Sequence, residues 1–393
     1  MKSKKKKKVL MIATYFPPSG GVGVFRITKF VKYLKLAGYE PVVVTIDNKY
    51  CINRDDGLLK DVEGIKVYRL NFSVLNNSVE KSFKKALDKG IYNIVDVEKP
   101  DILFLTGGPF KILPIGRKVY DKYKIPYIID LRDPWSLQKN NGTNAISRLK
   151  IRVYRYIESI CEKRTLEKAS YTCVVNDTMK KEYEKKYPNY KFAVISNGYD
   201  EDDFANIKPV KYKKFTILYT GKFSVSAGFR NPDTFFQALC HIDGVEFLHV
   251  GNIEQNIVDM TNYYNCSDKC KFVGFKSYNE VLSYAKGADA LLLISGNEPS
   301  EQTGKIFDYM GCNVPIIALT NKNNEIYKIC NNLDNVLVVD RNDVNAIISA
   351  VKQIKDGKLK SANRYNNIIY SRKYLCNELI KLIEKSDQDA WEN

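Results

Sequence analysis

The feature that most constrains the fold is an alternation between short, continuous apolar runs and stretches with helical spacing. The runs have the length of strands and lack the polar–apolar alternation of a sheet with one face in water, so we expect them to be buried on both faces. The pattern predicts an α/β protein with parallel sheets. The expected strands of the first half are Val9–Ala13, Val42–Ile46, Ile102–Leu105, Tyr127–Ile129, Tyr171–Val175 and Ala193–Ile195.

The pattern restarts after a polar stretch near residues 197–212. The expected strands of the second half are Phe215–Tyr219, Glu246–Val250, Lys271–Val273, Ala290–Ile294, Ile316–Leu319 and Val336–Val339. A length of 393 residues suits two domains. We therefore expect two doubly wound, Rossmann-like domains, over residues 1–206 and 207–365, followed by a helical tail over 366–393.

The charge of the chain leaves several kinds of partner open. The sequence contains 62 Lys and Arg and 45 Asp and Glu, a formal net charge of +17. Such an excess suits nucleic acid, an anionic membrane surface or polyphosphate substrates, and equally a compositional bias towards Lys. The block Lys4–Lys8 is interpreted either as a membrane-facing tail or as a flexible, solubilising one.

Targeting and metal-binding signals are missing from the sequence. The apolar run after the Lys block is too short for a signal peptide and has no cleavage site, and no run approaches about 18 apolar residues. The nine cysteines form no CxxC pair and there are two histidines, so neither a zinc site nor a disulfide framework is indicated. We expect a cytoplasmic protein without a metal or resident cofactor, with peripheral attachment to the inner face of the membrane if the Lys block binds there.

A glycine-rich turn, Tyr15–Gly23, follows the first expected strand and precedes a helix over Phe25–Leu36. Amides at a helix N-terminus favour a phosphate. Read as G-x-G-x-x-G from Gly21, the turn ends at Arg26, which is too large for the third glycine, so a dinucleotide cofactor is disfavoured. Gly20 and Gly21 are candidates for a phosphate or substrate loop, and a simple tight turn is the alternative.

The loop Gly221–Pro232 occupies the equivalent place in the second half and carries two cations, Lys222 and Arg230. Both side chains would be able to converge on a diphosphate. The alternative is a pair of solvated basic side chains on a surface loop.

A third motif, Thr303–Ile316, begins with Thr303-Gly304-Lys305 and places Asp308 three residues after Lys305, on the same helical face. A carboxylate near the carboxyl ends of parallel strands accepts the hydroxyls of a ribose. An ordinary salt bridge between the two side chains is the alternative.

Two acidic motifs differ in how strongly they indicate a binding site. Asp130-Leu131-Arg132-Asp133 directly follows a strand, where open α/β sheets bind ligands, with a helix cap or a core ion pair as the alternative. Asp200-Glu201-Asp202 resembles a metal-binding D-x-D pattern, but it lies in the expected interdomain connection, so a solvated turn is favoured and no metal site is expected.

In this order, the motifs resemble those of GT-B glycosyltransferases, most closely the retaining family 4 enzymes that build bacterial polysaccharides. The resemblance runs over nearly the whole chain. It rests on the opening glycine loop, Asp130–Trp135, Ile195–Asp200, Gly221–Pro232, Val273-Gly274-Phe275, Ala288–Leu293 and Lys305–Tyr309.

The resemblance implies that the second domain binds a nucleotide sugar, the first binds the acceptor, and the final helix crosses back onto the first domain. Lys222 and Arg230 match the diphosphate-binding cations, with Gly221 in the same loop. Lys305 lies near the phosphates, and Asp308 matches the second acid of a Glu-x7-Glu motif, which binds ribose. Gly274 and Phe275 resemble the base-binding turn.

Two family positions differ in this chain. Ser300 stands where the first acid of the Glu-x7-Glu motif is expected, and Glu301 or the backbone of Thr303 and Gly304 is the substitute. The family's His-Asp pair is missing, and Asp133, with Asp130 beside it, is the nearest acid. We assign catalytic roles to Lys222, Arg230 and Asp133.

The function that follows is transfer of a sugar from a nucleoside diphosphate sugar, with UDP expected, to a lipid-linked or growing saccharide in surface polysaccharide synthesis, without a metal and with retention of configuration. One alternative is a GT-B epimerase or hydrolase acting on a nucleotide sugar. The other is a basic nucleic-acid-binding or scaffold protein, but the informative cations lie in loops after strands, not interleaved with aromatic residues along a groove. We therefore expect no nucleic-acid partner.

Overall fold

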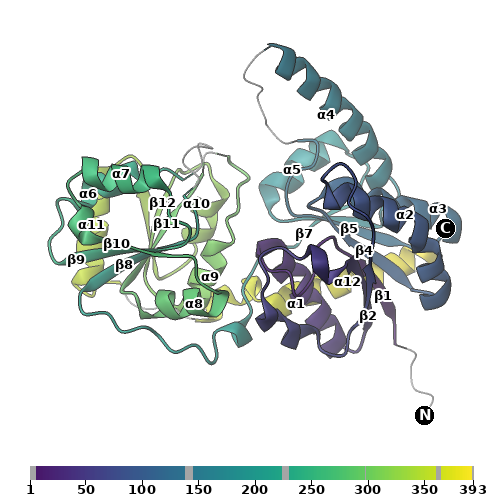
Figure 1. The fold of residues 1–393 in the computed structure, drawn as a ribbon, viewed down its shortest axis with the longest axis horizontal. Coiled ribbons are helices and arrows are strands. Elements are labelled where there is room, and N and C mark those ends of the chain that lie inside the picture. The colour runs from purple at the N-terminus through teal and green to yellow at the C-terminus, as the bar shows by residue number, and fades with distance from the viewer. Residues whose placement is uncertain (1–5, 138–144, 224–229, 297, 360–363, 392–393) are drawn as a thin grey trace. The chain divides into compact units, whose positions relative to one another are not determined.

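A computed structural model describes residues 6–137, 145–223, 230–296, 298–359 and 364–391. The chain divides into two compact units: unit 1 is Met1–Ser196 with Arg372–Asn393, and unit 2 is Asn197–Ser371 (Figure 1). Both boundaries expected from the sequence, at 206 and 365, lie inside unit 2. The α/β prediction is confirmed, since every strand pair in both sheets is parallel.

Unit 1 is built on a seven-stranded sheet with the order β3-β2-β1-β4-β5-β6-β7. Its strands are β1 (Lys8–Ile12), β2 (Glu40–Ile46), β3 (Lys66–Leu70), β4 (Ile102–Thr106), β5 (Tyr127–Leu131), β6 (Tyr171–Val174) and β7 (Phe192–Val194). Strand β3 lies at the sheet edge, is only partly buried and mixes basic with apolar residues, so it lacks the continuous apolar run that revealed the others. The order reverses between β1 and β4, which is where doubly wound sheets bind ligands.

Helices cover both faces of this sheet. They are α1 (Val22–Leu36), α2 (Val79–Glu98), α3 (Pro114–Tyr123), α4 (Ala145–Leu166), α5 (Asp177–Lys186) and α12 (Arg372–Trp391), with short 3₁₀ helices at Asn48–Tyr50, Asp56–Val62 and Phe110–Ile112. Helices α1 and α12 share one apolar core with the sheet, and α2, α3 and α5 share the other. Helix α12 buries Leu375, Leu379 and Ile383 in the first of these cores.

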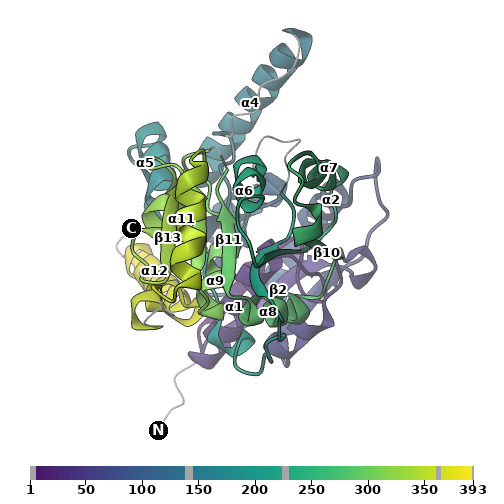
Figure 2. The ribbon, with the colours of Figure 1, turned by 90° about the vertical axis from the view of Figure 1, so that its left-hand side faces the viewer.

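Unit 2 repeats the design with a six-stranded sheet of order β10-β9-β8-β11-β12-β13 (Figure 2). Its strands are β8 (Phe215–Thr220), β9 (Val245–Val250), β10 (Cys270–Gly274), β11 (Ala290–Ile294), β12 (Ile316–Thr320) and β13 (Val336–Asp340). One face is covered by α8 (Tyr278–Gly287), α9 (Lys305–Cys312) and α10 (Glu325–Cys330), and the other by α6 (Asp233–Leu239), α7 (Gln255–Tyr263) and α11 (Val344–Lys355). The order reverses between β8 and β11, so a ligand is expected at the carboxyl ends of these strands.

The short helices of unit 2 correct two expectations. Its 3₁₀ helices span Glu201–Asp203, Ser267–Lys269 and Arg364–Tyr370. Asp200 caps the first and is 2% exposed, so this part of the acidic run is not a solvated turn. Ile368 and Ile369 fall within the range expected for the helical tail, but they belong to unit 2 and are 56% and 48% exposed.

Part of the basic block belongs to the fold of unit 1. Lys8 begins β1, and its Nζ lies 3.0 Å from a Glu40 oxygen and 2.9 Å from a Glu98 oxygen. Lys7 pairs with Asp387 of α12. These two lysines are therefore neutralised within the unit, while Lys4 and Lys5 lie outside the described residues. No helix in the described part of the chain is long and apolar enough to cross a membrane.

Candidate functional site

A tight backbone junction forms where β8 and β9 of unit 2 end. Gly221 adopts a φ of +74°, which favours glycine. A Cβ added at Gly251 would lie 2.7 Å from the Gly221 carbonyl oxygen, so the two loops touch through their backbones. The His249 Nε2 donates to the same oxygen at 2.7 Å. Burial lowers the pKa of His249, which favours the neutral imidazole. Its hydrogen bond to Gly221 holds the loop in place.

Lys305, the first residue of α9, lies against this junction. Its Nζ donates to the Tyr219 hydroxyl at 2.6 Å and to the Lys222 carbonyl at 3.2 Å, and it stands 4.0 Å from the centroid of the Tyr219 ring. No carboxylate among the described residues forms an ion pair with it. Burial, with the charge of Arg230 next, lowers the pKa of Lys305 well below its usual 10.5. An anion placed here would raise the pKa of this amine again and favour its charged form.

Arg230 and Glu301 form an ion pair close by, with side chains 19% and 15% exposed. Each keeps a buried polar atom without a hydrogen-bond partner, Nε of Arg230 and Oε2 of Glu301, and so do His249 Nδ1 and Ser295 Oγ. Buried polar atoms nearly always have partners. Four unpaired atoms around the ends of β9 and β11 therefore indicate a polar ligand.

The loop after β11 is shaped to admit Glu301. A Cβ at Gly296 would lie 1.8 Å from Glu301 Oε2, so glycine leaves room for the carboxylate in its observed position. The Asn324 amide donates to the Glu298 carbonyl at 3.0 Å, and the Glu325 N–H donates to the Pro299 carbonyl at 2.9 Å. The start of α10 thus holds this loop in place.

The structure brings Gly221, Arg230, Glu301 and Lys305 of the expected site together. Gly304 is the N-cap of α9, and Thr303 is buried before it. The Lys222 side chain is exposed, and its carbonyl, not its ammonium, contacts Lys305. Residues 224–229 of the same loop lie outside the described part.

The residues assigned to the nucleoside lie on the β10 side. Asp308 in the first turn of α9 accepts a hydrogen bond of 2.8 Å from the hydroxyl of Tyr278, the first residue of α8. Gly274 has a φ of +82° and its carbonyl accepts from the Gly251 N–H at 3.0 Å. Phe275 is 73% exposed. A flat aromatic surface therefore stands next to the turn assigned to the base.

Several polar residues of this site were missed by the sequence analysis. Tyr219 and His249 lie inside expected strands, where their polar ends are masked by apolar neighbours. Glu254 accepts from the Phe223 N–H at 2.8 Å, which fixes the loop after β8, although the two residues are 31 positions apart. A polar residue within the last two positions of a buried strand was the available signal for His249.

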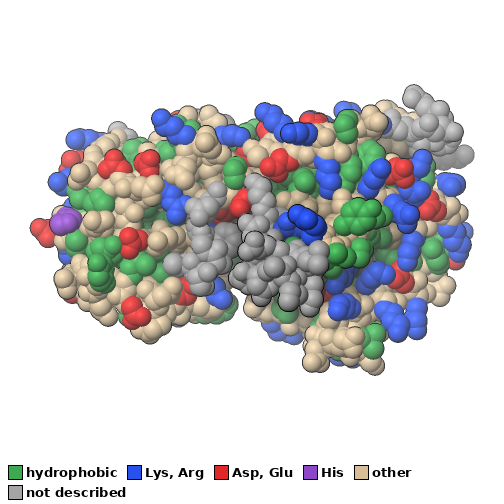
Figure 3. All heavy atoms as spheres, turned by 90° about the horizontal axis from the view of Figure 1, so that it is seen from above, with side chains coloured by type: hydrophobic (Ala, Val, Ile, Leu, Met, Phe, Trp, Pro, Cys, Tyr) green, Lys and Arg blue, Asp and Glu red, His purple; other side chains and the backbone are tan. Residues whose placement is uncertain are grey.

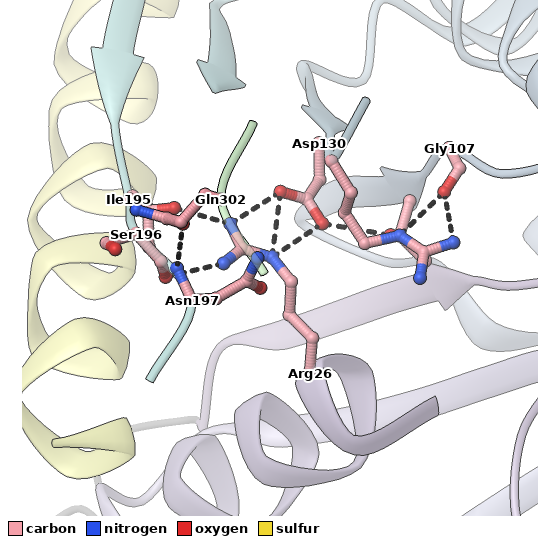
Figure 4. Close-up of polar contacts among 9 residues, drawn as sticks. Arg26, Gly107, Asp130, Ile195, Ser196, Asn197 and Gln302 are labelled. Atoms are coloured by element: carbon pink, nitrogen blue, oxygen red, sulfur yellow. Dashed lines mark hydrogen bonds and ion pairs between the residues drawn. The ribbon is translucent and has the colours of Figure 1, made fainter. Parts of the chain in front are cut away.

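In unit 1, Asp130 at the end of β5 forms a core ion pair with Arg26 of α1 (Figure 4). The two side chains are 0% and 1% exposed, and Arg26 Nη2 lies 2.7 Å from Asp130 Oδ1. Arg26 also donates to the carbonyls of Ser196, at 2.7 Å, and Ile195, at 2.9 Å, while the Thr106 hydroxyl donates to Asp130 at 2.9 Å. The core ion pair, one of the two alternatives for this motif, is therefore the role of Asp130.

The neighbouring Arg132 is also engaged. Its Nε donates to the Gly107 carbonyl at 2.8 Å, and burial lowers its pKa. A Cβ at Gly23 would lie 1.8 Å from Nη1 of Arg132, so the glycine at this position leaves room for the guanidinium. Asp133, by contrast, is exposed, and it follows the end of β5 at the carboxyl edge of the sheet.

Gly20 and Gly21 have backbone reasons to be glycine. A Cβ at Gly20 would lie 2.4 Å from the Asn53 carbonyl oxygen. Gly21 is the N-cap of α1 with a φ of +106°. Both positions suit a tight turn at a helix N-terminus, and they leave the expected phosphate or substrate role open to experiment.

Comparison with solved structures identifies the class. Over 97% of its length the chain matches sucrose-phosphate synthase from Thermosynechococcus elongatus (99% of that chain, 15% identity, TM-score 0.70). It also matches Anabaena HepE in complex with UDP and glucose (98% and 100% of the two chains, 12% identity, TM-score 0.60) and UDP-GlcNAc 2-epimerase from Methanocaldococcus jannaschii (96% and 99%, 15% identity, TM-score 0.59). These matches and the two parallel sheets define the GT-B fold. A comparison with curated proteins finds no significant match.

Family models then give the particular family. The Glycosyltransferase Family 4 model matches residues 19–203, and the Glycosyl transferases group 1 model matches residues 214–356. The chain belongs to these glycosyltransferases, as the sequence resemblance indicated, and it is a transferase enzyme.

Proposed function

We propose that the enzyme transfers a sugar from a nucleoside diphosphate sugar, with UDP as the carrier, to a lipid-linked or growing saccharide acceptor in surface polysaccharide synthesis. The observation that carries the donor assignment is the cluster at the carboxyl edge of the unit 2 sheet. There, Lys305 has no ion-pair partner among described residues and Arg230 keeps an unpaired buried Nε. The Anabaena structure with UDP and glucose, which shares this fold, supports the choice of UDP.

The chemistry follows from charge. Cleavage of the sugar–phosphate bond leaves negative charge on a diphosphate, and cations fixed beforehand in a partly dry site stabilise it most effectively. Lys305 and Arg230 supply this charge without a metal, and Lys222 adds a third cation from the same loop. Glu301, once Arg230 turns towards phosphate, accepts hydroxyls of the donor sugar in place of the family's first acid. Retention of configuration is proposed from the family resemblance.

The rest of the donor is held by the β10 side of the site. Asp308, oriented by Tyr278, accepts a ribose hydroxyl, and the Gly274 turn with Phe275 receives the base. Gly304 presents the N-terminus of α9 to the phosphates. In unit 1, Gly20 and Gly21 form the phosphate or substrate loop, and Asp133 acts as the catalytic acid on the acceptor side.

The cell compartment is part of the proposal. All nine cysteines are free thiols, which agrees with a reducing cytoplasm. A lipid-linked acceptor would bring the enzyme to the inner face of the cell membrane.

The experiment is a two-stage screen. Thermal shift with a panel of nucleotide sugars finds the donor, since a ligand that binds only the folded state raises its apparent stability. Incubation with that donor, labelled in the sugar, then separates the reactions: label in a larger saccharide supports transfer. Label recovered only as free sugar or as an epimerised nucleotide sugar would favour the hydrolase or epimerase alternative. A UDP-GlcNAc 2-epimerase is among the proteins that share this fold.

A further inference from the structure

Helix α4 of unit 1 presents a run of large apolar side chains to solvent. Val153, Tyr154, Tyr156, Ile157 and Ile160 are 53%, 53%, 69%, 59% and 39% exposed. Figures 1 and 2 both show α4 extending beyond the other helices of unit 1. Single exposed apolar residues are normal, but a contiguous group of this size indicates an interaction surface.

The spacing of these residues puts four of them on one stripe. Val153, Tyr156, Ile157 and Ile160 follow the i, i+3, i+4, i+7 pattern of a helix face. The opposite face anchors the helix to unit 1: Leu166 is buried, and the buried Glu162 accepts from the Tyr183 hydroxyl at 2.8 Å. The stripe is therefore not the face of α4 that packs on unit 1, because the buried contacts of the helix lie on its opposite side.

The charge around the stripe is of one sign. Arg152, Lys163 and Arg164 are exposed beside it, whereas the acidic residues of α4 lie elsewhere: Glu162 is buried and Glu158 interacts with Tyr154. Cations flanking an apolar stripe are typical of helices that lie in the surface of an anionic membrane. Tyrosines are also favoured at that boundary.

The same sign dominates the whole of unit 1. Its sequence holds 43 Lys and Arg and 25 Asp and Glu, a net charge of +18, whereas unit 2 holds 19 and 20, a net charge of −1. A compositional bias would affect both units alike. Figure 3 shows Lys and Arg side chains gathered over the unit 1 half of the visible face. The excess charge therefore belongs to the unit that carries α4.

A second copy of the chain is a poorer occupant of the stripe. With Val153 and Ile160 as core positions of a paired helix, the flanking positions are Arg152, Ile157, Ser159 and Arg164. None is acidic, so two copies would bring cations together without compensation.

We propose that α4 docks unit 1 on an anionic lipid surface, with Val153, Tyr156, Ile157 and Ile160 inserted among the acyl chains and Arg152, Lys163 and Arg164 on the headgroups. This surface is separate from the nucleotide-sugar site and needs no substrate to bind lipid. If the proposed sugar transfer failed, the lipid-docking proposal would still stand. If lipid docking failed, the proposed sugar transfer would still stand.

The test is co-sedimentation of the full chain with phosphatidylglycerol-rich or phosphatidylcholine vesicles. We expect binding to the anionic vesicles that weakens with added salt. The double change Tyr156→Ser and Ile157→Ser should weaken it about tenfold or more. The matched control is Tyr263→Ser with Val97→Ser, two residues 79% and 69% exposed on other helices, which should bind as the wild type does.

Other outcomes decide against the proposal. Undiminished vesicle binding by the Tyr156/Ile157 variant, with its melting temperature unchanged, would overturn it. So would loss of binding on removal of residues 1–6 alone, since the basic terminus would then be the anchor. Equal binding to phosphatidylcholine would contradict the role of charge, and a wild-type dimer that the variant converts to monomer, without vesicle binding, would assign the stripe to a second copy.

Discussion

Arg26 shows how far single residues can be interpreted from sequence. The glycine pattern correctly argued that this position does not suit a dinucleotide loop, because the side chain is too large. It did not reveal why Arg stands there, since its partner Asp130 is 104 positions away and the carbonyls of Ile195 and Ser196 are farther still. Long-range polar contacts of this kind have no local signal.

The Arg26–Asp130 pair is predicted to be structural. Removing one member, as in Arg26→Met, leaves a buried carboxylate unpaired and should lower the free energy of unfolding by about 3–5 kcal/mol, measured by urea denaturation. The double variant Arg26→Met with Asp130→Leu should recover much of this loss. Arg54→Ala, which removes a surface pair 61% and 58% exposed, is the control and should cost less than about 1 kcal/mol. A single variant as stable as wild type would contradict this role.

Arg230 is predicted to act in chemistry, not in folding. Arg230→Ala should lower kcat by about 10²–10³, the usual effect of losing one preorganised donor to a developing anion. Its melting temperature should change little, because truncation to Ala removes no apolar core contact and opens a path for water to the carboxylate of Glu301, whose side chain is 15% exposed. Lys271→Ala, a change in an edge-strand pair 64% exposed at the lysine, is the control and should keep full activity. Equal kcat in wild type and Arg230→Ala would remove Arg230 from the mechanism.

At the scale of elements, strands were predictable and loops were not. All twelve expected strands begin and end within two residues of the observed ones, because a buried parallel strand is a continuous apolar run. Strand β3 was missed, since an edge strand needs no such run. The loops that shape the site depend on backbone approaches, such as Gly251 on Gly221, that sequence does not specify.

Gly296 tests this account of the loop after β11. Gly296→Ala would place a Cβ 1.8 Å from Glu301 Oε2 and should displace the carboxylate, which raises the KM for the donor about tenfold or more with a small loss of stability. The control is Gly90→Ala within α2, where an added Cβ meets nothing within 4 Å. That change should leave KM unchanged and stabilise the protein by about 0.5–1 kcal/mol. Unchanged donor kinetics in Gly296→Ala would show that Glu301 does not need its observed position.

At the scale of the whole molecule, the sequence indicated two α/β domains but not the distribution of charge between them. The net charge of +17 was compatible with compositional bias until the boundaries were known. With those boundaries it falls entirely on unit 1. The return of the final helix to unit 1 was likewise implied by family resemblance alone, because the sequence of the tail does not indicate which unit the helix packs against.

Helix α12 is predicted to be an integral part of unit 1. Leu379 is 0% exposed in the core that α12 shares with α1, so Leu379→Ala should lower the free energy of unfolding by about 2–5 kcal/mol. Ile368→Ala, at a position 56% exposed, should change it by less than about 0.5 kcal/mol. Hydrogen exchange should show the loss in β1, β4 and α1. A loss confined to unit 2 would contradict the assignment.

The central claim is that the edge of the unit 2 sheet binds a nucleoside diphosphate through Lys305, and calorimetric titration of UDP tests it most directly. Burial lowers the pKa of Lys305 in the free protein, and a bound diphosphate would raise it again. Binding should therefore take up a proton at pH values between the pKa of the free protein and that of the complex. The affinity for UDP should fall as the pH rises through the pKa of the free protein. Titrations in buffers of different ionisation enthalpy measure this uptake. We predict saturable UDP binding with proton uptake, both sharply reduced in Lys305→Met. No saturable binding, or identical affinity and uptake in the variant, would contradict the account.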